Sequence, residues 1–186
     1  GIGKAIAKRF AEEGAVVVLN DMNAERLAEA EAEFVALFGK DTVVSSELNV
    51  TDQNQIKKTF ALASLAFGGI DIVVNNAGLS ISKPIEEHSE ADWDLLYDVL
   101  VKGQFFITQA AAHVLKAQAI GGDIINIVSK NALVSGPNNA GYGSAKAAQL
   151  HLSRLNAAEL GPYKIRVNVV NPDAVISDSN IWAGGW

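Results

Sequence analysis

GAVVVLND, residues 14–21, is the stretch of sequence that decides the fold class. Its apolar, Val-rich run over residues 15–19 is typical of a strand that is buried on both faces in a parallel sheet. Gly14 ends an expected helix over residues 1–13, in which apolar side chains recur at helical spacing. The stretch therefore predicts a helix that is followed directly by a buried strand.

The same alternation of strands and helices continues along the chain. Apolar runs predict strands at residues 42–48, 70–74, 124–128 and 165–170, and helical patterns predict helices at residues 24–38, 52–67, 89–119 and 141–160. This order favours an α/β fold with a doubly wound parallel sheet, Rossmann-like and three-layered, with helices on both faces. Since no linker, low-complexity tract or repeat interrupts it, we expect a single domain over residues 1–186. The loops after the strands are where such a sheet binds its ligand.

The composition fits a globular protein and excludes several classes of partner. Of the 186 residues, 49% are hydrophobic and 19% are charged, which excludes an intrinsically disordered chain. The formal net charge of −6 argues against nucleic acid and anionic membrane surfaces, and no apolar run is long enough to span a bilayer. The absence of cysteine favours a cytoplasmic location. The three histidines lack a carboxylate at metal-ligand spacing, so we expect no metal site.

The first residues resemble a phosphate-binding helix start. Gly1, Ile2 and Gly3 open a helix, where backbone N–H groups can approach a phosphate closely. A simple helix cap or a cloning remnant would explain the glycines equally well. Asp21, at the end of the next strand, can accept hydrogen bonds from ribose hydroxyls and would repel a 2′-phosphate, which favours NAD over NADP. The alternative for Asp21 is a helix cap, with Asn23 as its competitor.

Tyr142 and Lys146 are the candidate chemical groups, because residues four apart lie on one face of a helix. A free tyrosine titrates about three pH units too high for a base at neutral pH. A neighbouring ammonium group stabilises the phenolate, so we expect the pKa of Tyr142 to be lowered. Ser129, at the end of a strand, could hydrogen-bond the same substrate oxygen. The alternative is a surface lysine beside a half-buried tyrosine.

Taken together, these motifs resemble the short-chain dehydrogenase/reductase family over essentially the whole chain. The matching pieces, in chain order, are Gly1-Ile2-Gly3, Asn49-Val50-Thr51-Asp52, Asn75-Asn76-Ala77-Gly78, Ser129, Tyr142-x-x-x-Lys146, Val167-Asn168 and Asn171-Pro172. Several motifs in the right order are far more specific than any one of them.

The resemblance implies a role for each matching residue. Tyr142 would be the catalytic acid/base, Lys146 would bind the nicotinamide ribose and tune Tyr142, and Ser129 would orient the substrate carbonyl. The implied cofactor-binding residues are Gly1, Ile2, Gly3, Asp21, Asn49, Val50, Asn76, Ala77, Gly78, Tyr142, Lys146, Pro172 and Val175. It also implies a homodimer or homotetramer formed through the helices at residues 89–119 and 141–160.

A narrower resemblance points to the dehydrogenase half of bifunctional rhamnulose-1-phosphate aldolase/alcohol dehydrogenases. The matching segments are residues 127–132 and 171–175, with Ile181-Trp182 and Gly185-Trp186. In this group the substrate is associated with lactaldehyde, so the resemblance implies a small alcohol, aldehyde or sugar-derived substrate and a fused aldolase domain. Asp173 stands where the wider family has glycine after the proline.

The sequence departs from the family in three places. The first strand is absent, which would leave a break between the strands that end at Asn20 and Val74, and the C-terminal end is also missing, so we expect a domain truncated at both ends. Leu100 aligns with the family's relay asparagine and cannot form its hydrogen bonds. The leading hypothesis is an NAD-dependent oxidoreductase, and the alternatives are a non-catalytic nucleotide-binding module or a structural partner domain.

Overall fold

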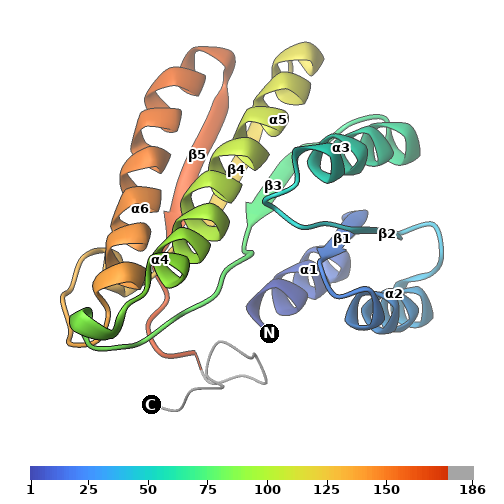
Figure 1. Cartoon of the computed structure of the whole chain (residues 1–186). Coiled ribbons are helices and arrows are strands. Elements are labelled where there is room, and N and C mark those ends of the chain that lie inside the picture. Colours follow the sequence, from blue (N-terminus) through green and yellow to red (C-terminus); the bar gives the residue numbers. More distant parts are fainter. Residues whose placement is uncertain (176–186) are drawn as a thin grey trace.

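The protein, here as a computed structural model, is described over residues 1–175 and consists there of parallel strands and the helices that connect them (Figure 1). The strands are β1 (Val17–Asp21), β2 (Val43–Glu47), β3 (Ile72–Asn75), β4 (Gly122–Ile127) and β5 (Ile165–Val170). The α-helices are α1 (Ile2–Glu12), α2 (Ala24–Phe38), α3 (Gln53–Phe67), α4 (Glu90–Tyr97), α5 (Gly103–Gln118) and α6 (Ala140–Leu160). Short helical turns are η1 (Ile85–Glu87), η2 (Asp98–Lys102), η3 (Lys130–Ala132) and η4 (Gly161–Tyr163).

The predicted alternation of strands and helices is confirmed, and one predicted element is wrong. The single helix expected at residues 89–119 is interrupted by η2, a π-helical turn in which the N–H of Gly103 donates to the carbonyl of Asp98. Ser89 and Asp92 form a capping box that fixes the start of α4. The hydrophobic pattern runs on through the interruption, because a π turn adds one residue without ending the helix.

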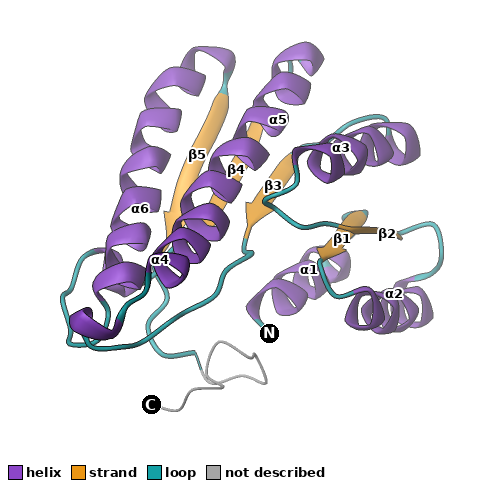
Figure 2. Cartoon of the chain, in the orientation of Figure 1, coloured by secondary structure: helices purple, strands orange, loops and turns teal. Residues whose placement is uncertain are grey.

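The parallel sheet is in two parts (Figure 2). Within residues 1–175, β1 pairs only with β2, and β3, β4 and β5 pair in that order, all in parallel. The break lies between β1 and β3, where the sequence predicts it. An apolar cavity of about 370 Å³ occupies the inner side of this break, lined by Ile2, Ile6, Phe10, Val74, Ile125, Ile127, Val170 and Pro172. The residues of α1 therefore face β3, β4 and β5 across this cavity.

Helices cover both sides of the strands, as in a three-layer α/β fold (Figure 1). α5 and α6 lie over one face of β3, β4 and β5, whereas α1 and α2 pack on β1 and β2. The carboxyl ends of β3, β4 and β5 point toward one edge, and α1 begins on that side. This edge is where the candidate site residues meet.

The core is divided between the two parts of the sheet. A cluster around Phe34 joins α1 and α2 to β1 and β2, and a cluster around Ile124 joins α5 and α6 to β4 and β5. The prediction of strands buried on both faces is only partly right, since Ile72 and Val170 are each exposed to more than 40%. The cause is that β3 has no neighbour on one side and that, among residues 1–175, helices cover β5 mainly on the face toward α6.

Within residues 1–175 no helix has both the length and the apolar character needed to cross a membrane. Ile181, Trp182, Gly185 and Trp186, which belong to the narrower resemblance, lie outside the described residues.

Candidate active site

Ser129, Tyr142 and Lys146 are brought together at the carboxyl end of β4. Ser129 follows that strand directly, and its Oγ accepts the backbone N–H of Asn131 at 3.2 Å, which fixes the start of η3. Tyr142 and Lys146 lie one turn apart on α6 and are 7% and 4% exposed. The Tyr142 side chain also hydrogen-bonds the Ser129 side chain. The hydroxyls of Ser129 and Tyr142 can therefore meet one substrate oxygen.

Lys146 points along the inner face of α6 toward β4. Its Nζ donates to the carbonyl of Ile127 at 3.2 Å and lies 5.7 Å from the centre of the Tyr142 ring. Tyr142 and Lys146 thus share one side of their helix, as their spacing predicts. The ammonium is held between the end of β4 and the phenol.

The expected acidification of Tyr142 is wrong for this state of the protein. Burial raises the pKa of the Tyr142 phenol above 10, and the hydrogen bond with Ser129 offsets only part of that effect. Burial also lowers the pKa of the Lys146 ammonium to about 8. The reason is that both groups lose water at the same place, and desolvation by burial is the largest effect on each of them. At neutral pH the phenol is protonated and most of the lysine remains a cation.

The helix start at Gly1, Ile2 and Gly3 packs directly against the loop after β3. A Cβ on Gly3 would lie only 2.6 Å from Nδ2 of Asn76, so a larger residue would displace the Asn76 amide. Gly1 stands at the N-cap position of α1, without a side chain that could cover the helix end. A helix N-terminus beside an amide side chain is an arrangement that suits a phosphate.

Asp21 lies at the exposed carboxyl end of β1. Its Oδ1 accepts the backbone N–H of Asn23 at 2.8 Å, whereas Asn23 itself caps α2 by accepting the N–H of Arg26. The competing role as helix cap therefore belongs to Asn23, and Asp21 supports the turn that precedes the helix. The carboxylate stands on the same side of the molecule as the start of α1.

The loops after β2 and β3 contribute the next group of predicted residues. Asn49 folds its loop by accepting the N–H and the hydroxyl of Thr51, and Val50 packs against Gly103 of α5. Ala77 and Gly78 follow Asn76 after β3. A Cβ on Gly78 would lie 4.0 Å from Nζ of Lys146, which places this loop beside the buried ammonium.

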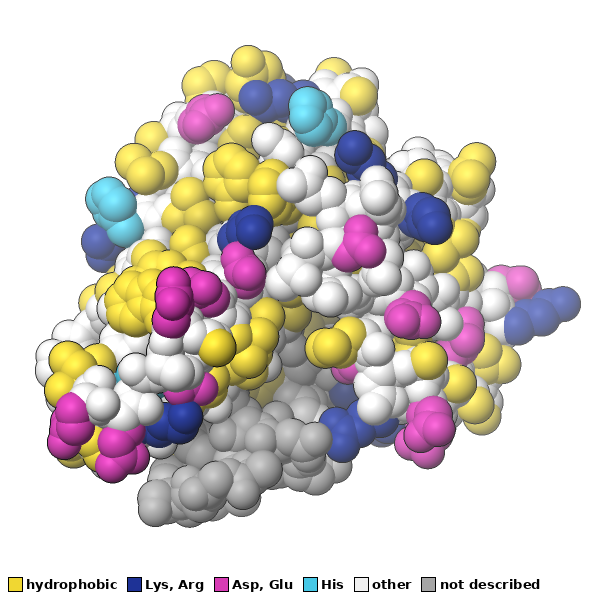
Figure 3. All heavy atoms as spheres, in the orientation of Figure 1, with side chains coloured by type: hydrophobic (Ala, Val, Ile, Leu, Met, Phe, Trp, Pro, Cys, Tyr) yellow, Lys and Arg dark blue, Asp and Glu magenta, His cyan; other side chains and the backbone are white. Residues whose placement is uncertain are grey.

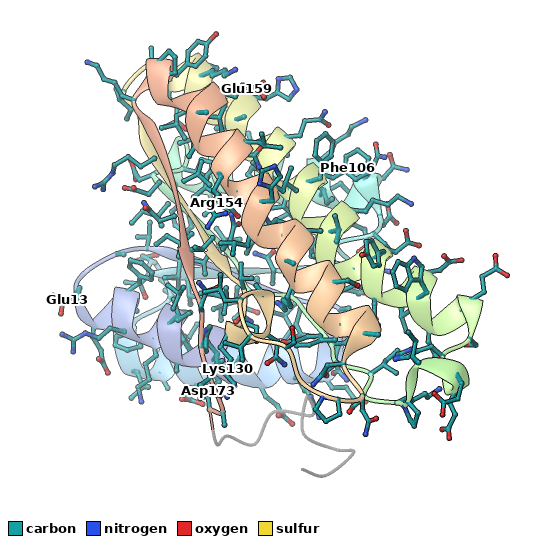
Figure 4. All side chains as sticks on the ribbon, turned by 90° about the vertical axis from the view of Figure 1, so that its left-hand side faces the viewer. Glu13, Phe106, Lys130, Arg154, Glu159 and Asp173 are labelled. Atoms are coloured by element: carbon teal, nitrogen blue, oxygen red, sulfur yellow. The ribbon has the colours of Figure 1, made fainter. Side chains whose placement is uncertain are left out.

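The segment after β5 is tied to the loop that holds Ser129. The carbonyl of Pro172 accepts the N–H of Lys130 at 2.9 Å, and Lys130 Nζ forms an ion pair of 2.5 Å with Asp173 (Figure 4). The hydrogen bond to Lys130 lowers the pKa of the Asp173 carboxyl. Sequence reasoning missed this pair, although the unusual Asp173 was its signal. Pro172 thus lies next to the Ser129 loop, and Val175 follows as the last described residue.

Leu100 is a second feature whose surroundings sequence reasoning did not find. It is fully buried within η2, and its carbonyl accepts Nε2 of Gln149 at 2.6 Å. Gln149 stands three residues after Lys146 on the buried side of α6. The signal in the sequence was a pair of polar residues, Gln149 and Ser153, on the inner face of an otherwise apolar helix.

Residues 1–175 contain no cluster of histidine, aspartate or glutamate that could hold a metal ion. The nicotinamide dinucleotide that the motifs imply is better matched by the site. Two observations support the fit: the Asn76 amide lies directly against Gly3 at the start of α1, and Oδ1 of Asn171, next to Pro172, is buried without a hydrogen-bond partner among residues 1–175. The residues at the strand ends can hold such a cofactor through backbone and amide groups.

An α/β fold with a parallel sheet, a glycine-opened helix at the strand ends and a buried Ser–Tyr–Lys group defines a class of nicotinamide-dependent oxidoreductases. Comparisons with known proteins agree. The chain matches the family described as short chain dehydrogenase over residues 1–182. The chain therefore belongs to the short-chain dehydrogenase/reductase family and is an enzyme of that type.

Individual relatives illustrate this similarity. An uncharacterized oxidoreductase of Bacillus subtilis, YuxG, is 42% identical over the whole chain, which spans only 27% of that relative's length. A 3-oxoacyl-[acyl-carrier-protein] reductase of Thermotoga maritima is 37% identical over 92% of the chain and 69% of its own length. The crystal structure of a Burkholderia cenocepacia gluconate 5-dehydrogenase with NADP and tartrate matches with a TM-score of 0.89 and 31% identity, covering 97% of this chain and 69% of that one.

Proposed function

We propose that the chain is the catalytic domain of an NAD-dependent dehydrogenase that interconverts a small alcohol with its aldehyde or ketone. The observation that supports this most is the grouping of Ser129, Tyr142 and Lys146 at the end of β4. A non-catalytic nucleotide-binding module would have no use for a lysine buried at this cost beside a phenol.

In this proposal Tyr142 moves the proton. During reduction its phenol donates a proton to the substrate oxygen, and during oxidation its phenolate takes the hydroxyl proton, while the bound nicotinamide supplies or accepts the hydride at carbon. Ser129 donates a hydrogen bond to the same oxygen and holds it in line. The Lys146 cation stabilises the phenolate whenever it forms. Because burial raises the pKa of Tyr142, the resting phenol carries the proton that reduction requires.

The cofactor-binding residues follow the loops at the strand ends. In this proposal Gly1, Ile2 and Gly3 hold the phosphates, Asn49 and Val50 lie at the adenine, and Asn76, Ala77 and Gly78 run along the cofactor. Lys146 and Tyr142 hold the nicotinamide ribose, and Pro172 and Val175 lie at the nicotinamide amide. Asp21 supports NAD over NADP because a carboxylate repels a 2′-phosphate. The gluconate 5-dehydrogenase of similar fold contains NADP, so the preference for NAD proposed here depends on Asp21 and not on the fold.

For the substrate we propose lactaldehyde or a related sugar-derived aldehyde, on the narrower resemblance to the dehydrogenase half of bifunctional aldolase/dehydrogenases. The length of YuxG is compatible with this arrangement, since the region that matches this chain is about a quarter of it. We further propose that the whole protein includes an aldolase domain and is cytoplasmic, the latter on the cysteine-free composition alone.

We also propose a homodimer or homotetramer, with one domain over residues 1–186 as its unit. Apolar side chains gather over α4, α5 and α6 on the face shown in Figure 3. Trp93 and Phe105 are each exposed to more than 40%, and Trp93 stacks on Tyr97. A second copy of the same chain would cover such a face, as oligomers of this family do.

The test is the variant Tyr142→Phe in the natural full-length protein. We expect NADH formation from L-lactaldehyde or a panel of sugar alcohols to fall at least a thousandfold, with NAD affinity within a few-fold of the wild type. Fluorescence titration with NADH and initial rates measure the two quantities. Unchanged turnover would refute the role of Tyr142, and NAD binding without any turnover by the wild type would favour the non-catalytic alternative.

A further inference from the structure

The π turn η2 has a hydrogen-bond partner from a distant helix. In a π turn the bonds run from residue i to residue i+5, so the regular pattern is interrupted and carbonyls become free for other donors. Gln149 of α6 uses this opportunity, because its Nε2 donates to the carbonyl of Leu100 at 2.6 Å. This is the shortest of the hydrogen bonds that Gln149 and its polar neighbours form.

Gln149 is an unusual residue for its position. It is only 4% exposed, and its Oε1 has no hydrogen-bond partner among the residues that the structure describes. A buried amide oxygen without a partner destabilises a fold, and an apolar side chain of the same size would avoid that cost. The donor half of the amide is therefore the part that the structure uses.

The bond to Leu100 determines what lies beside Lys146. A Cβ on Gly78 would lie 3.2 Å from Cδ2 of Leu100 and 4.0 Å from Nζ of Lys146. The leucine side chain and the ammonium therefore approach the same point of the loop after β3. By holding the backbone of Leu100, Gln149 keeps this apolar side chain between Gly78 and the interior, next to the ammonium.

A buried polar network anchors Gln149 in turn. Its backbone carbonyl accepts the hydroxyl of Ser153 at 2.7 Å and Nε2 of Gln104 at 3.3 Å. Ser153 also accepts Nδ2 of Asn126 at 2.8 Å, and Asn126 precedes Ile127, whose carbonyl holds Lys146. The network thus connects the π turn, α6 and the end of β4 around one lysine.

We propose that Gln149 is a positioning residue for the oxidoreductase reaction: through the Leu100 carbonyl it fixes the π turn, and the turn in turn keeps Lys146 in line with Tyr142. This inference rests on the proposed function. In this proposal Gln149 and Leu100 together confine the Lys146 ammonium. A polar side chain in place of Leu100 would contact that ammonium in a different way.

The test compares Gln149→Met with the control Gln118→Met in the natural full-length protein. Both changes remove an amide that donates to a backbone carbonyl, that of Leu100 at 2.6 Å or that of Ile70 at 2.7 Å, but Gln118 is the last residue of α5 and lies outside the network around Lys146. We expect Gln149→Met to lower kcat about tenfold with substrate KM within twofold. The pH at which the oxidation rate is half-maximal should rise by about 0.5 to 1 unit. Gln118→Met should lower Tm but leave kcat within twofold and this pH within 0.2 unit.

The pH profile reports the Tyr142 phenol and the Lys146 ammonium that lies 5.7 Å from its ring on the same helix. His88 packs against the neighbouring Gly141, where its ring would lie 3.4 Å from an added Cβ. An unchanged kcat and profile in Gln149→Met, or equal changes in both variants, would overturn the proposal. If Gln149→Met does not fold, Gln149→Asn shortens the side chain by one methylene and should give the same result. A Tyr142→Phe variant that keeps full turnover would instead refute the proposed function itself.

Discussion

The buried pair of Tyr142 and Lys146 is arranged for a reaction at the expense of stability. Each group loses hydration, and each is moved by burial toward its neutral form. The spacing of the pair could be read from the sequence, because it follows from helix geometry. The direction of the tyrosine pKa could not, because it depends on how much of the molecule covers the phenol.

The buried Lys146 ammonium should lower the free energy of unfolding at neutral pH. Burial lowers its pKa from 10.5 to about 8, so between these values the unfolded chain binds more protons, and stability rises with pH. Below pH 8 the burial of the Lys146 charge lowers the free energy of unfolding by its full amount. At pH 7 we expect the free energy of unfolding of Lys146→Met to exceed that of the wild type by about 2 kcal/mol. Each pKa unit is worth about 1.4 kcal/mol, and the lost bond to Ile127 offsets part of the gain.

Urea unfolding at pH 7 and pH 9.5 measures this difference. The stability advantage of Lys146→Met should shrink at the higher pH, as the wild-type lysine loses its proton in the folded state. Lys57→Met, at an exposed position of α3, is the control and should show no such pH dependence. A constant difference between the two pH values would show that the lysine charge is not the cause.

The carboxylate of Asp21 should set the choice of cofactor. We expect Asp21→Ala to lower the ratio of kcat/KM for NAD over NADP about tenfold or more, because the repulsion of a 2′-phosphate is lost. Asp21→Asn separates charge from geometry, since an amide oxygen can still accept the N–H of Asn23. Initial rates with both cofactors measure the ratio. If neither variant alters it, Asp21 serves only the turn.

At the scale of the elements, strands and helices were largely predictable, and their interruptions were not. The bounds of β5 are those expected, because a turn precedes its mainly apolar run and Asn171 follows it, so both ends of the strand are marked in the sequence. The break in the long helix at η2 could not be foreseen from residues 98–102 alone. Its stabilising partner, Gln149, is 49 residues from Leu100 along the chain. The ion pair of Lys130 and Asp173 could not be foreseen either, because the sheet brings together two residues that are far apart along the chain.

The packing of α5 on the loop after β2 depends on a glycine. A Cβ on Gly103 would lie 2.8 Å from Cγ2 of Val50, so Gly103→Ala must displace the valine and its loop. We expect a loss of about 1–3 kcal/mol and a few-fold weaker NAD binding. Chemical unfolding and titration with NADH measure the two effects.

Gly143→Ala is the matched control, because it lies in a helix as well. Its Cβ would meet only the carbonyl oxygen of Asn131, at an ordinary 3.5 Å. Here alanine should be neutral or stabilise α6 by about 0.5–1 kcal/mol through its lower conformational entropy. If both substitutions destabilise the protein equally, contact with Val50 is not the reason.

At the scale of the whole molecule, the sequence predicted the fold class and the break in the sheet. It did so because helix and strand signals alternate along the chain, and because pairs of valine or isoleucine residues begin β1, β2 and β3. It could not show that α1 would face β3, β4 and β5 across an apolar cavity, because this depends on how the two parts of the sheet and their helices pack against each other.

The exposed apolar face of α4, α5 and α6 leads to a prediction about assembly. Trp93 of α4 and Phe105 of α5 are exposed, whereas other side chains of the same helices are buried in the core. An apolar surface of this kind on a protein with a net charge of −6 is best explained by contact with a second copy. We expect the natural protein to be a dimer or tetramer and Phe105→Glu to shift it to monomers, because each carboxylate would be buried without a partner.

Size-exclusion chromatography with light scattering measures the mass of each variant. Leu65→Glu is the control, since Leu65 is 86% exposed on α3, a helix that is not part of that face, and should leave the assembly unchanged. A wild-type monomer would contradict the prediction directly. An oligomer that Phe105→Glu leaves intact would mean that the copies meet elsewhere, and the aromatic face of α4 and α5 would then need a different partner.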